Sequence, residues 1–244
     1  MKPVVAAEDR PADAAPLRVG GLVRFSNTDW PGKLAAVIFL QGCPWQCGYC
    51  QNPHLLPARG VQEEDWPATL AWLATRRGLL DAVVFSGGEP TARPGLGAAI
   101  RALRALGFAI GLHTGGAYPR RLIEIARDVD WIGLDVKAPL DAYALVTGMP
   151  RSGIAAFASL DLLRKAGVAL EVRTTVHPAL TPPETLVALA RELAQAGVVS
   201  WVLQAFRPTG CSSQTLLAAA PRGAPIDPGT VALLRAYVPE IIVR

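Results

Sequence analysis

Six short apolar runs, separated by amphipathic stretches of helical length, recur along most of this chain of 244 residues. This alternation predicts repeated βα units and a parallel sheet, because two parallel strands need a crossover connection, which is usually a helix. The predicted strands are Leu34–Leu40, Ala82–Phe85, Ala109–His113, Trp131–Val136, Leu170–Val176 and Trp201–Ala205. The predicted helices are Trp66–Thr75, Leu96–Leu106, Pro119–Arg127, Ile154–Lys165 and Pro183–Gln195.

The composition indicates one α/β domain. A hydrophobic fraction of 51% over 244 residues is enough for one sizeable core, which we expect to span residues 18–244. Residues 1–17 are rich in Ala, Pro and charge and lack an apolar signal core, so we expect a disordered lead-in. The Pro- and Gly-rich stretch after Pro208 makes residues 208–244 a C-terminal extension, to which the sequence assigns no role.

Charge and cysteine content exclude several classes of protein. The net charge is +4, but the arginines are scattered and form no basic stripe, so we expect no nucleic-acid partner. No run approaches the roughly 20 apolar residues of a membrane span, so we expect no membrane partner. Four cysteines are too few for a disulfide scaffold of this length, which favours a reducing, cytoplasmic setting.

Three cysteines are concentrated in the segment Cys43-Pro-Trp-Gln-Cys47-Gly-Tyr-Cys50, directly after the first predicted strand. Three thiolates can hold one iron–sulfur cubane and leave its fourth iron without a protein ligand, where chemistry can take place. His54 offers an alternative, a Cys3His zinc site in a binding module, which would leave no reactive metal. We favour it less, because zinc modules rarely need a six-strand α/β body. Cys211 is isolated, and we interpret it as a buried small residue or a redox bystander, not as a fourth cluster ligand.

Polar residues follow the carboxyl end of each predicted strand. In barrel-like α/β folds the loops at these ends build the active site, so we expect them to converge with the cysteine loop on one face. The segments are Ser86–Pro90, His113–Gly116, Asp135–Lys137, Arg173–His177 and Gln204–Arg207.

Two of these segments carry residues with a clear chemical use. Gly87 and Gly88 would let backbone groups approach a ligand closely, and Glu89 could accept hydrogen bonds from a cationic amino group. Asp135 and Lys137 alternate along one strand and so point to the same side. There they could hold a ribose hydroxyl and a carboxylate, or they could simply form an ion pair at the strand end.

With these motifs in place, the chain resembles the radical S-adenosylmethionine (SAM) superfamily, and within it the activating enzymes of glycyl-radical proteins. The resemblance covers residues 20–207 and includes the Gly-Gly-Glu-Pro turn that begins at Gly87. The segments Gly20–Ser26, Asp29–Lys33, Gln41–Cys43 and Asn52–His54 are most similar to the anaerobic ribonucleoside-triphosphate reductase activating proteins. The resemblance implies a partial, open (β/α)6 barrel.

The resemblance also implies cofactors, a partner and site residues. Cys43, Cys47 and Cys50 would ligate a 4Fe–4S cluster that binds and reductively cleaves SAM. The radical formed would abstract hydrogen from a backbone glycine of a glycyl-radical enzyme, with an electron donor such as flavodoxin or ferredoxin. Tyr49 holds the aromatic position that lies near the adenine, although plain packing explains it equally well. The implied SAM-binding residues are Tyr49, Gly87, Gly88, Glu89, Thr114, Asp135, Lys137, Arg173 and Arg207.

Two alternatives keep the radical chemistry but change the substrate: a pyruvate formate-lyase type activator, or a radical SAM enzyme acting on a small molecule. Auxiliary clusters need further cysteines, and only Cys211 lies outside the motif, which argues against elaborate small-molecule versions. An open barrel of six units also suits a large protein substrate, because one side stays uncovered. We assign no chemistry to His113 or His177.

Overall fold

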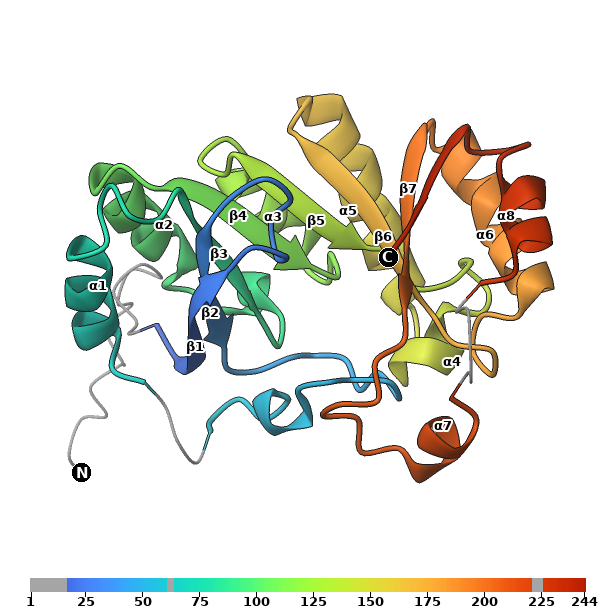
Figure 1. The fold of residues 1–244 in the computed structure, drawn as a ribbon, viewed down its shortest axis with the longest axis horizontal. Coiled ribbons are helices and arrows are strands. Elements are labelled where there is room, and N and C mark those ends of the chain that lie inside the picture. Colours follow the sequence, from blue (N-terminus) through green and yellow to red (C-terminus); the bar gives the residue numbers. More distant parts are fainter. Residues whose placement is uncertain (1–16, 61–63, 221–225) are drawn as a thin grey trace, which may run out of the picture.

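The computed structural model describes residues 17–60, 64–220 and 226–244. Within these residues the strands form one sheet in the order β1 to β8, in which β1 is antiparallel to β2 and all later neighbours are parallel (Figure 1). The strands are β1 Val19–Ser26, β2 Ala35–Leu40, β3 Ala82–Gly87, β4 Ala109–Thr114, β5 Trp131–Asp135, β6 Leu170–Val176, β7 Ser200–Ala205 and β8 Glu240–Val243. The sheet is open, with β1 and β8 at its edges.

Helices connect the parallel strands and cover the outer side of the sheet (Figure 1). Local signals set their ends: the Asp65 carboxylate caps α1, and Gly167, in a left-handed conformation with φ 67°, ends α5. No helix in the described ranges is long and apolar enough to cross a membrane. The helices are α1 Trp66–Ala74, α2 Leu96–Ala105, α3 Pro119–Ala126, α4 Tyr143–Thr147, α5 Ser152–Ala166, α6 Pro183–Gln195, α7 Gln214–Ala218 and α8 Pro228–Leu234, with 3-10 turns η2 Pro53–Leu55 and η3 Pro90–Ala92.

The partial barrel predicted from the sequence is confirmed, with two strands added. The six predicted strands are β2 to β7, and β1 and β8 extend the sheet at its two edges. β1 lacks an apolar run because it is a half-exposed edge strand that contains two glycines. β8 has only four residues and is too short to predict. The predicted lead-in lies outside the described residues except for Leu17, which is buried.

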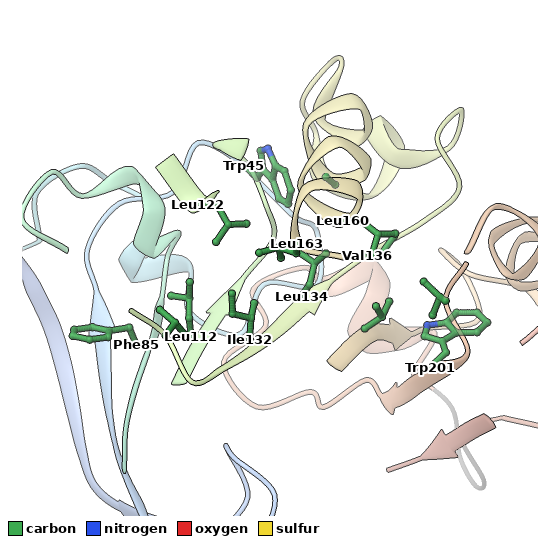
Figure 2. Packing of buried hydrophobic residues seen from close by; sticks show 14 of the residues in the cluster. Trp45, Phe85, Leu112, Leu122, Ile132, Leu134, Val136, Leu160, Leu163 and Trp201 are labelled. Atoms are coloured by element: carbon green, nitrogen blue, oxygen red, sulfur yellow. The ribbon is translucent and has the colours of Figure 1, made fainter. Parts of the chain in front are cut away.

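Side chains of the parallel strands alternate between two faces of the sheet. On the outer face, strand residues such as Leu112 and Leu134 pack against α3 and α5. Figure 2 shows Leu122 of α3 and Leu160 and Leu163 of α5 lying over these strands. This large core lies between the sheet and its helices, so the inner, concave face is left for other uses.

A second, smaller core fills the amino-terminal half of the concave face. Trp30, from the loop between β1 and β2, stacks on Trp131 with ring centroids 5.4 Å apart and an interplanar angle of 14°. Gly111 makes room for it, since a Cβ there would lie 2.9 Å from Trp30 Cε3. Around the two rings lie the small side chains Ala35, Val37, Ala82 and Val84. The loop therefore closes this end of the half-barrel, and only the carboxyl end stays open.

We expect Gly111→Val to destabilise the fold by about 1–3 kcal/mol, because the added side chain collides with Trp30 and Val84. The matched control is Gly21→Val, since a Cβ at Gly21 meets nothing within 4 Å. It should stay within about 0.5 kcal/mol of the wild-type protein. Denaturant unfolding of the three proteins measures both values, and equal stabilities for the two variants would contradict the packing described above.

Candidate functional site

A cavity of about 1000 Å³ opens at the carboxyl ends of the parallel strands. This volume is at the upper end of the range for small-molecule sites, so it can hold a large ligand or parts of two. All twelve site residues predicted from the sequence line it: Cys43, Cys47, Tyr49, Cys50, Gly87, Gly88, Glu89, Thr114, Asp135, Lys137, Arg173 and Arg207. The topology thus brings together the residues that the sequence places at the ends of different strands.

The cysteine loop follows β2 and is held by main-chain hydrogen bonds from α4. The amide of Gln46 donates to the carbonyl oxygen of Thr147 at 2.8 Å, and the amide of Gly48 donates to that of Val146 at 3.2 Å. Along the lower side of Figure 1 this loop runs from β2 towards α4 and α7. The carbonyl groups at the end of α4 therefore fix the backbone between the thiols of Cys43, Cys47 and Cys50.

Arg207 and the C-terminal extension that follows it also contact this loop. The Gln51 side-chain amide donates to the carbonyl oxygen of Arg207 at 3.2 Å, and Cys211 Sγ donates to that of Gly48 at 3.6 Å. His177, which is fully buried, contacts the α7 carbonyl oxygen of Leu216 through Nε2 at 3.0 Å. Cys211 therefore supports the cysteine loop, and His177 supports α7.

Burial keeps the thiols of the cysteine loop protonated in the absence of a metal. It raises the pKa of Cys43 to about 12 and also raises the pKa values of Cys47 and Cys50, while Lys137 acts in the opposite direction on all three. A bound metal ion, with a higher charge than Lys137, ionises such thiols when they become its ligands. In the described ranges no three Cys, His, Asp or Glu side chains are gathered closely enough to hold a metal. The three thiols share one loop and one cavity, and they would have to come closer together to bind a common centre.

Gly87 and Gly88 bring the end of β3 against its neighbours. Gly87 has φ 114°, and a Cβ there would lie 2.2 Å from the amide nitrogen of Leu40. A Cβ at Gly88 would lie 2.4 Å from the carbonyl oxygen of Gly42, just before the cysteine loop. Only glycine fits either position, so this turn is fixed close to the cysteine loop.

Glu89 is almost fully buried, at 2% exposure, and its carboxylate is already occupied by protein donors. Oε1 accepts from the Thr91 amide at 3.0 Å and from Thr114 Oγ1 at 2.7 Å, and Oε2 accepts from the Gly115 amide at 2.9 Å. Burial raises the pKa of Glu89, and these hydrogen bonds oppose the rise. Glu89 therefore joins the turns after β3 and β4, while Oε2, which accepts one hydrogen bond, keeps acceptor capacity towards the cavity.

Asp135 is at the centre of a charge network on the inner face. It lies directly beside Arg173 in the β5–β6 register, and Oδ1 accepts from Arg173 Nε at 2.9 Å and Nη2 at 2.8 Å. Lys137 Nζ lies 3.6 Å from Oδ2. Burial alone would raise the pKa of Asp135, but the two cations outweigh it and lower that pKa. The network leaves an excess of one positive charge at the cavity wall.

Tyr49 and Trp45 form an aromatic wall beside Lys137. The ammonium of Lys137 lies 5.5 Å from the ring centroid of Tyr49 and 6.0 Å from that of Trp45. Tyr49 is 7% exposed, and its buried hydroxyl has no hydrogen-bond partner among the described residues. An unpaired buried hydroxyl lowers the stability of a folded protein. Its presence here favours a bound ligand that supplies the missing hydrogen-bond partner.

His113 lines the cavity although the sequence assigned it no chemistry. Its Nε2 lies 2.7 Å from the main-chain carbonyl oxygen of Asp29. Burial and then the charge of Arg173 lower the pKa of His113 to about 3, so the ring is neutral at physiological pH. The contact joins residues 84 positions apart, so no local sequence signal could have revealed it.

Further polar residues of the cavity were given no individual role by the sequence. They come from the loop after β1, from β4, from the ends of β6 and β7, and from the last residue of the chain. Arg244 also pairs with Glu171, with Nη2 2.6 Å from Oε2. The set is Asn27, Thr28, Asp29, His113, Thr175, Gln204 and Arg244.

Comparison with known protein families identifies the architecture. The model of the Radical SAM superfamily matches residues 37–193, a span that includes the cysteine loop, the Gly-Gly-Glu turn and the Asp135 network. The chain belongs to the radical SAM superfamily. This protein therefore shares with that superfamily the use of a 4Fe–4S cluster and SAM.

Individual relatives show which radical SAM proteins this chain is similar to. It is 30% identical, over 78% of its length and 80% of the relative's, to a Methanocaldococcus jannaschii protein named as a glycyl-radical enzyme activating enzyme. It is 29% identical to the pyruvate formate-lyase-activating enzyme of Clostridium pasteurianum, over 67% of this chain and 70% of that enzyme. SuiB of Streptococcus suis bound to SAM shares the fold, with a TM-score of 0.60, 14% identity and coverage of 84% of this chain and 48% of SuiB.

The site fits the superfamily's cofactors. Three thiols on one loop provide the donor atoms, and the unpaired Tyr49 hydroxyl and the excess positive charge lie on the adjoining wall. His54 is exposed and is not among the residues that line the cavity with the cysteines. Family membership thus decides between the two metal hypotheses in favour of the iron–sulfur cluster.

The neutral imidazole of His113 makes stability depend on pH. Its pKa is about 3 in the folded protein against 6.5 ordinarily, so the unfolded chain takes up this proton first as the pH falls. Its contribution is complete above about pH 6.5 and is lost progressively towards pH 3. We therefore expect the wild-type protein to lose more unfolding free energy than His113→Gln between pH 7 and pH 4.5 in urea titrations. The exposed-site control His54→Gln should follow the wild type, and parallel curves for all three would contradict the assignment.

Proposed function

We propose that this radical SAM protein activates a glycyl-radical enzyme, and that anaerobic ribonucleoside-triphosphate reductase is its partner. The observation that carries the proposal is the shared cavity, which joins the cysteine loop to the charged residues at the ends of β5 and β6. The relatives named as glycyl-radical enzyme activators support the activity. The segments around Asp29 and Gln41 support the choice of partner.

Each predicted residue has a part in this proposal. When bound, the cluster and SAM supply a 5′-deoxyadenosyl radical, which takes a hydrogen atom from a glycine. Cys43, Cys47 and Cys50 hold three irons of the cluster. Lys137 and Arg207 offer cationic donors to the SAM carboxylate. The remaining positions surround the nucleoside and the amino group: Tyr49, Gly87, Gly88, Glu89, Thr114, Asp135 and Arg173.

Arg207 differs from the other cations of the cavity in having no ion pair with a described residue. Arg173 and Lys137 are both paired with Asp135, and Arg244 is paired with Glu171. The Arg207 side chain is exposed at the rim and has no ion pair with a described residue. We therefore assign it to the end of SAM nearest the solvent.

A pyruvate formate-lyase type activator is the second candidate, favoured by the Clostridium pasteurianum relative. We further propose a flavodoxin or ferredoxin as electron donor and the cytoplasm as the compartment. A small-molecule substrate remains the alternative to a protein glycine, and turnover of such a substrate without any partner protein would overturn the proposal.

The direct test is anaerobic. The protein is reconstituted with iron and sulfide, reduced, and given SAM together with either candidate partner. The proposal requires 5′-deoxyadenosine and a glycyl-radical doublet in the electron paramagnetic resonance spectrum of the ribonucleotide reductase. A doublet only on pyruvate formate-lyase would select the second candidate, and no 5′-deoxyadenosine from a verified cluster would refute the activity.

Replacing any one of Cys43, Cys47 or Cys50 by Ala should abolish both the brown absorbance of the cluster and the cleavage of SAM. Each thiol supplies one iron with its ligand, and two thiols do not hold a cubane stably. Cys211→Ala is the matched control, because Cys211 only donates to the Gly48 carbonyl. It should keep the iron and sulfide content of the wild type. Full activity in any of the three loop variants would contradict the ligand assignment.

Lys137→Ala should leave the cluster intact and weaken SAM binding by about 1.5–3 kcal/mol, because a charged hydrogen bond is lost. This corresponds to a roughly 10- to 150-fold higher dissociation constant. Lys165→Ala is the control, since Lys165 lies on the surface in a pair with Asp161. Calorimetric titration of the reconstituted proteins measures the effect. An unchanged affinity would restrict Lys137 to its ion pair with Asp135.

A further inference from the structure

His113 is held in one orientation by contacts from two directions. The carbonyl oxygen of Asp29 lies 2.7 Å from Nε2, and the ring meets Trp131 edge-on with centroids 5.5 Å apart. The carbonyl group is itself fixed, because the next residue, Trp30, is stacked on Trp131 in the small inner core. The imidazole therefore has little freedom to turn.

This arrangement fixes the tautomer of His113. A carbonyl oxygen can only accept, so Nε2 carries the proton and donates it, and the neutral ring keeps a lone pair on Nδ1. Nδ1 has no hydrogen-bond partner in the described part of the chain, yet it is not a fully buried atom. Since His113 lines the cavity, this lone pair is available to a bound ligand.

The charges around His113 restrict which donor can use that lone pair. Arg173 and Lys137 are both close to Asp135, the only carboxylate paired with either of them in the described part of the chain. The guanidinium of Arg173 also lies 6.0 Å from the centroid of the Trp131 ring that His113 contacts. The charges that act on His113 are thus already paired with each other, and a neutral N–H donor needs no further counter-charge beside them.

We propose that His113 Nδ1 accepts a hydrogen bond from a backbone N–H of the polypeptide that carries the reacting glycine. The inference rests on the proposed function and adds a substrate-binding residue to it. The cavity supports it in a second way, because Asn27, Thr28, Thr175 and Gln204 add uncharged donors and acceptors to the lining. Such groups match the neutral amides of a peptide better than they match a charged cofactor.

Two substitutions distinguish the hydrogen bonds made by the two ring nitrogens of His113. Asn places an amide group near the position of Nδ1 and can present an acceptor to the cavity, whereas Gln places its amide nitrogen near Nε2. His113→Gln can therefore keep the bond to Asp29 but loses the acceptor that faces the ligand. Iron content and circular dichroism of both variants establish that each is folded and carries its cluster.

The probe is a peptide that contains the radical glycine of whichever partner enzyme is activated in the assay above. The α-carbon of that glycine carries deuterium. Copies of the peptide are N-methylated at one amide each. Deuterium transferred into 5′-deoxyadenosine gives kcat and KM for every enzyme and peptide. We expect wild type and His113→Asn to disfavour one N-methylated copy about tenfold, and His113→Gln to lose that discrimination and to raise KM for the parent peptide by a similar factor.

Several results would overturn the inference. One is that His113→Gln discriminates between the N-methylated peptides as the wild type does. Another is that the wild type turns over all N-methylated peptides equally well. A third is loss of peptide-free SAM cleavage in His113→Gln, which would place Nδ1 on the cofactor. Absence of SAM cleavage in the wild type itself would refute the proposed function instead, so the two failures are distinguishable. If His113→Asn does not fold, the comparison of wild type with His113→Gln still decides.

Discussion

The architecture depends on how the concave face of an open barrel is filled. A sheet of parallel strands is normally buried on both sides, but here helices cover only the outer face. The loop between β1 and β2 solves this at the amino-terminal end by inserting Trp30 against Trp131. Because that half is closed by apolar packing, the predicted site residues all lie at the carboxyl end, around one cavity.

The same constraint explains the electrostatics of the site. The inner-face residues at the ends of β5 and β6 are charged, and a buried charge must find a partner. Asp135 meets this need for both Arg173 and Lys137 and leaves the wall with a net positive charge. The wall beside the cysteine loop thus attracts an anionic group, while the neutral imidazole of His113 and its uncharged neighbours suit an amide. One cavity can in this way accommodate two chemically different ligands.

The positions of the predicted site residues follow from topology more than from any one motif. Parallel strands end at the same edge, so residues such as Gly87, Asp135 and Arg207 could be placed together from the order of apolar runs alone. The interactions of these residues with one another could not. Sequence reasoning offered Glu89 as an acceptor for a ligand, and it could not show that the same carboxylate joins the turns after β3 and β4.

The sequence by itself determined the six central strands, the cysteine loop and the residues that surround the cavity, because local apolar periodicity and motif spacing set these features. Tertiary structure alone decided what supports the site: α4 against the cysteine loop, α7 against His177, and Asp29 against His113. These contacts join residues far apart in the chain through single carbonyl groups, which every residue carries. The order of side chains therefore does not predict these contacts, and only the folded backbone shows which carbonyl group accepts from which donor.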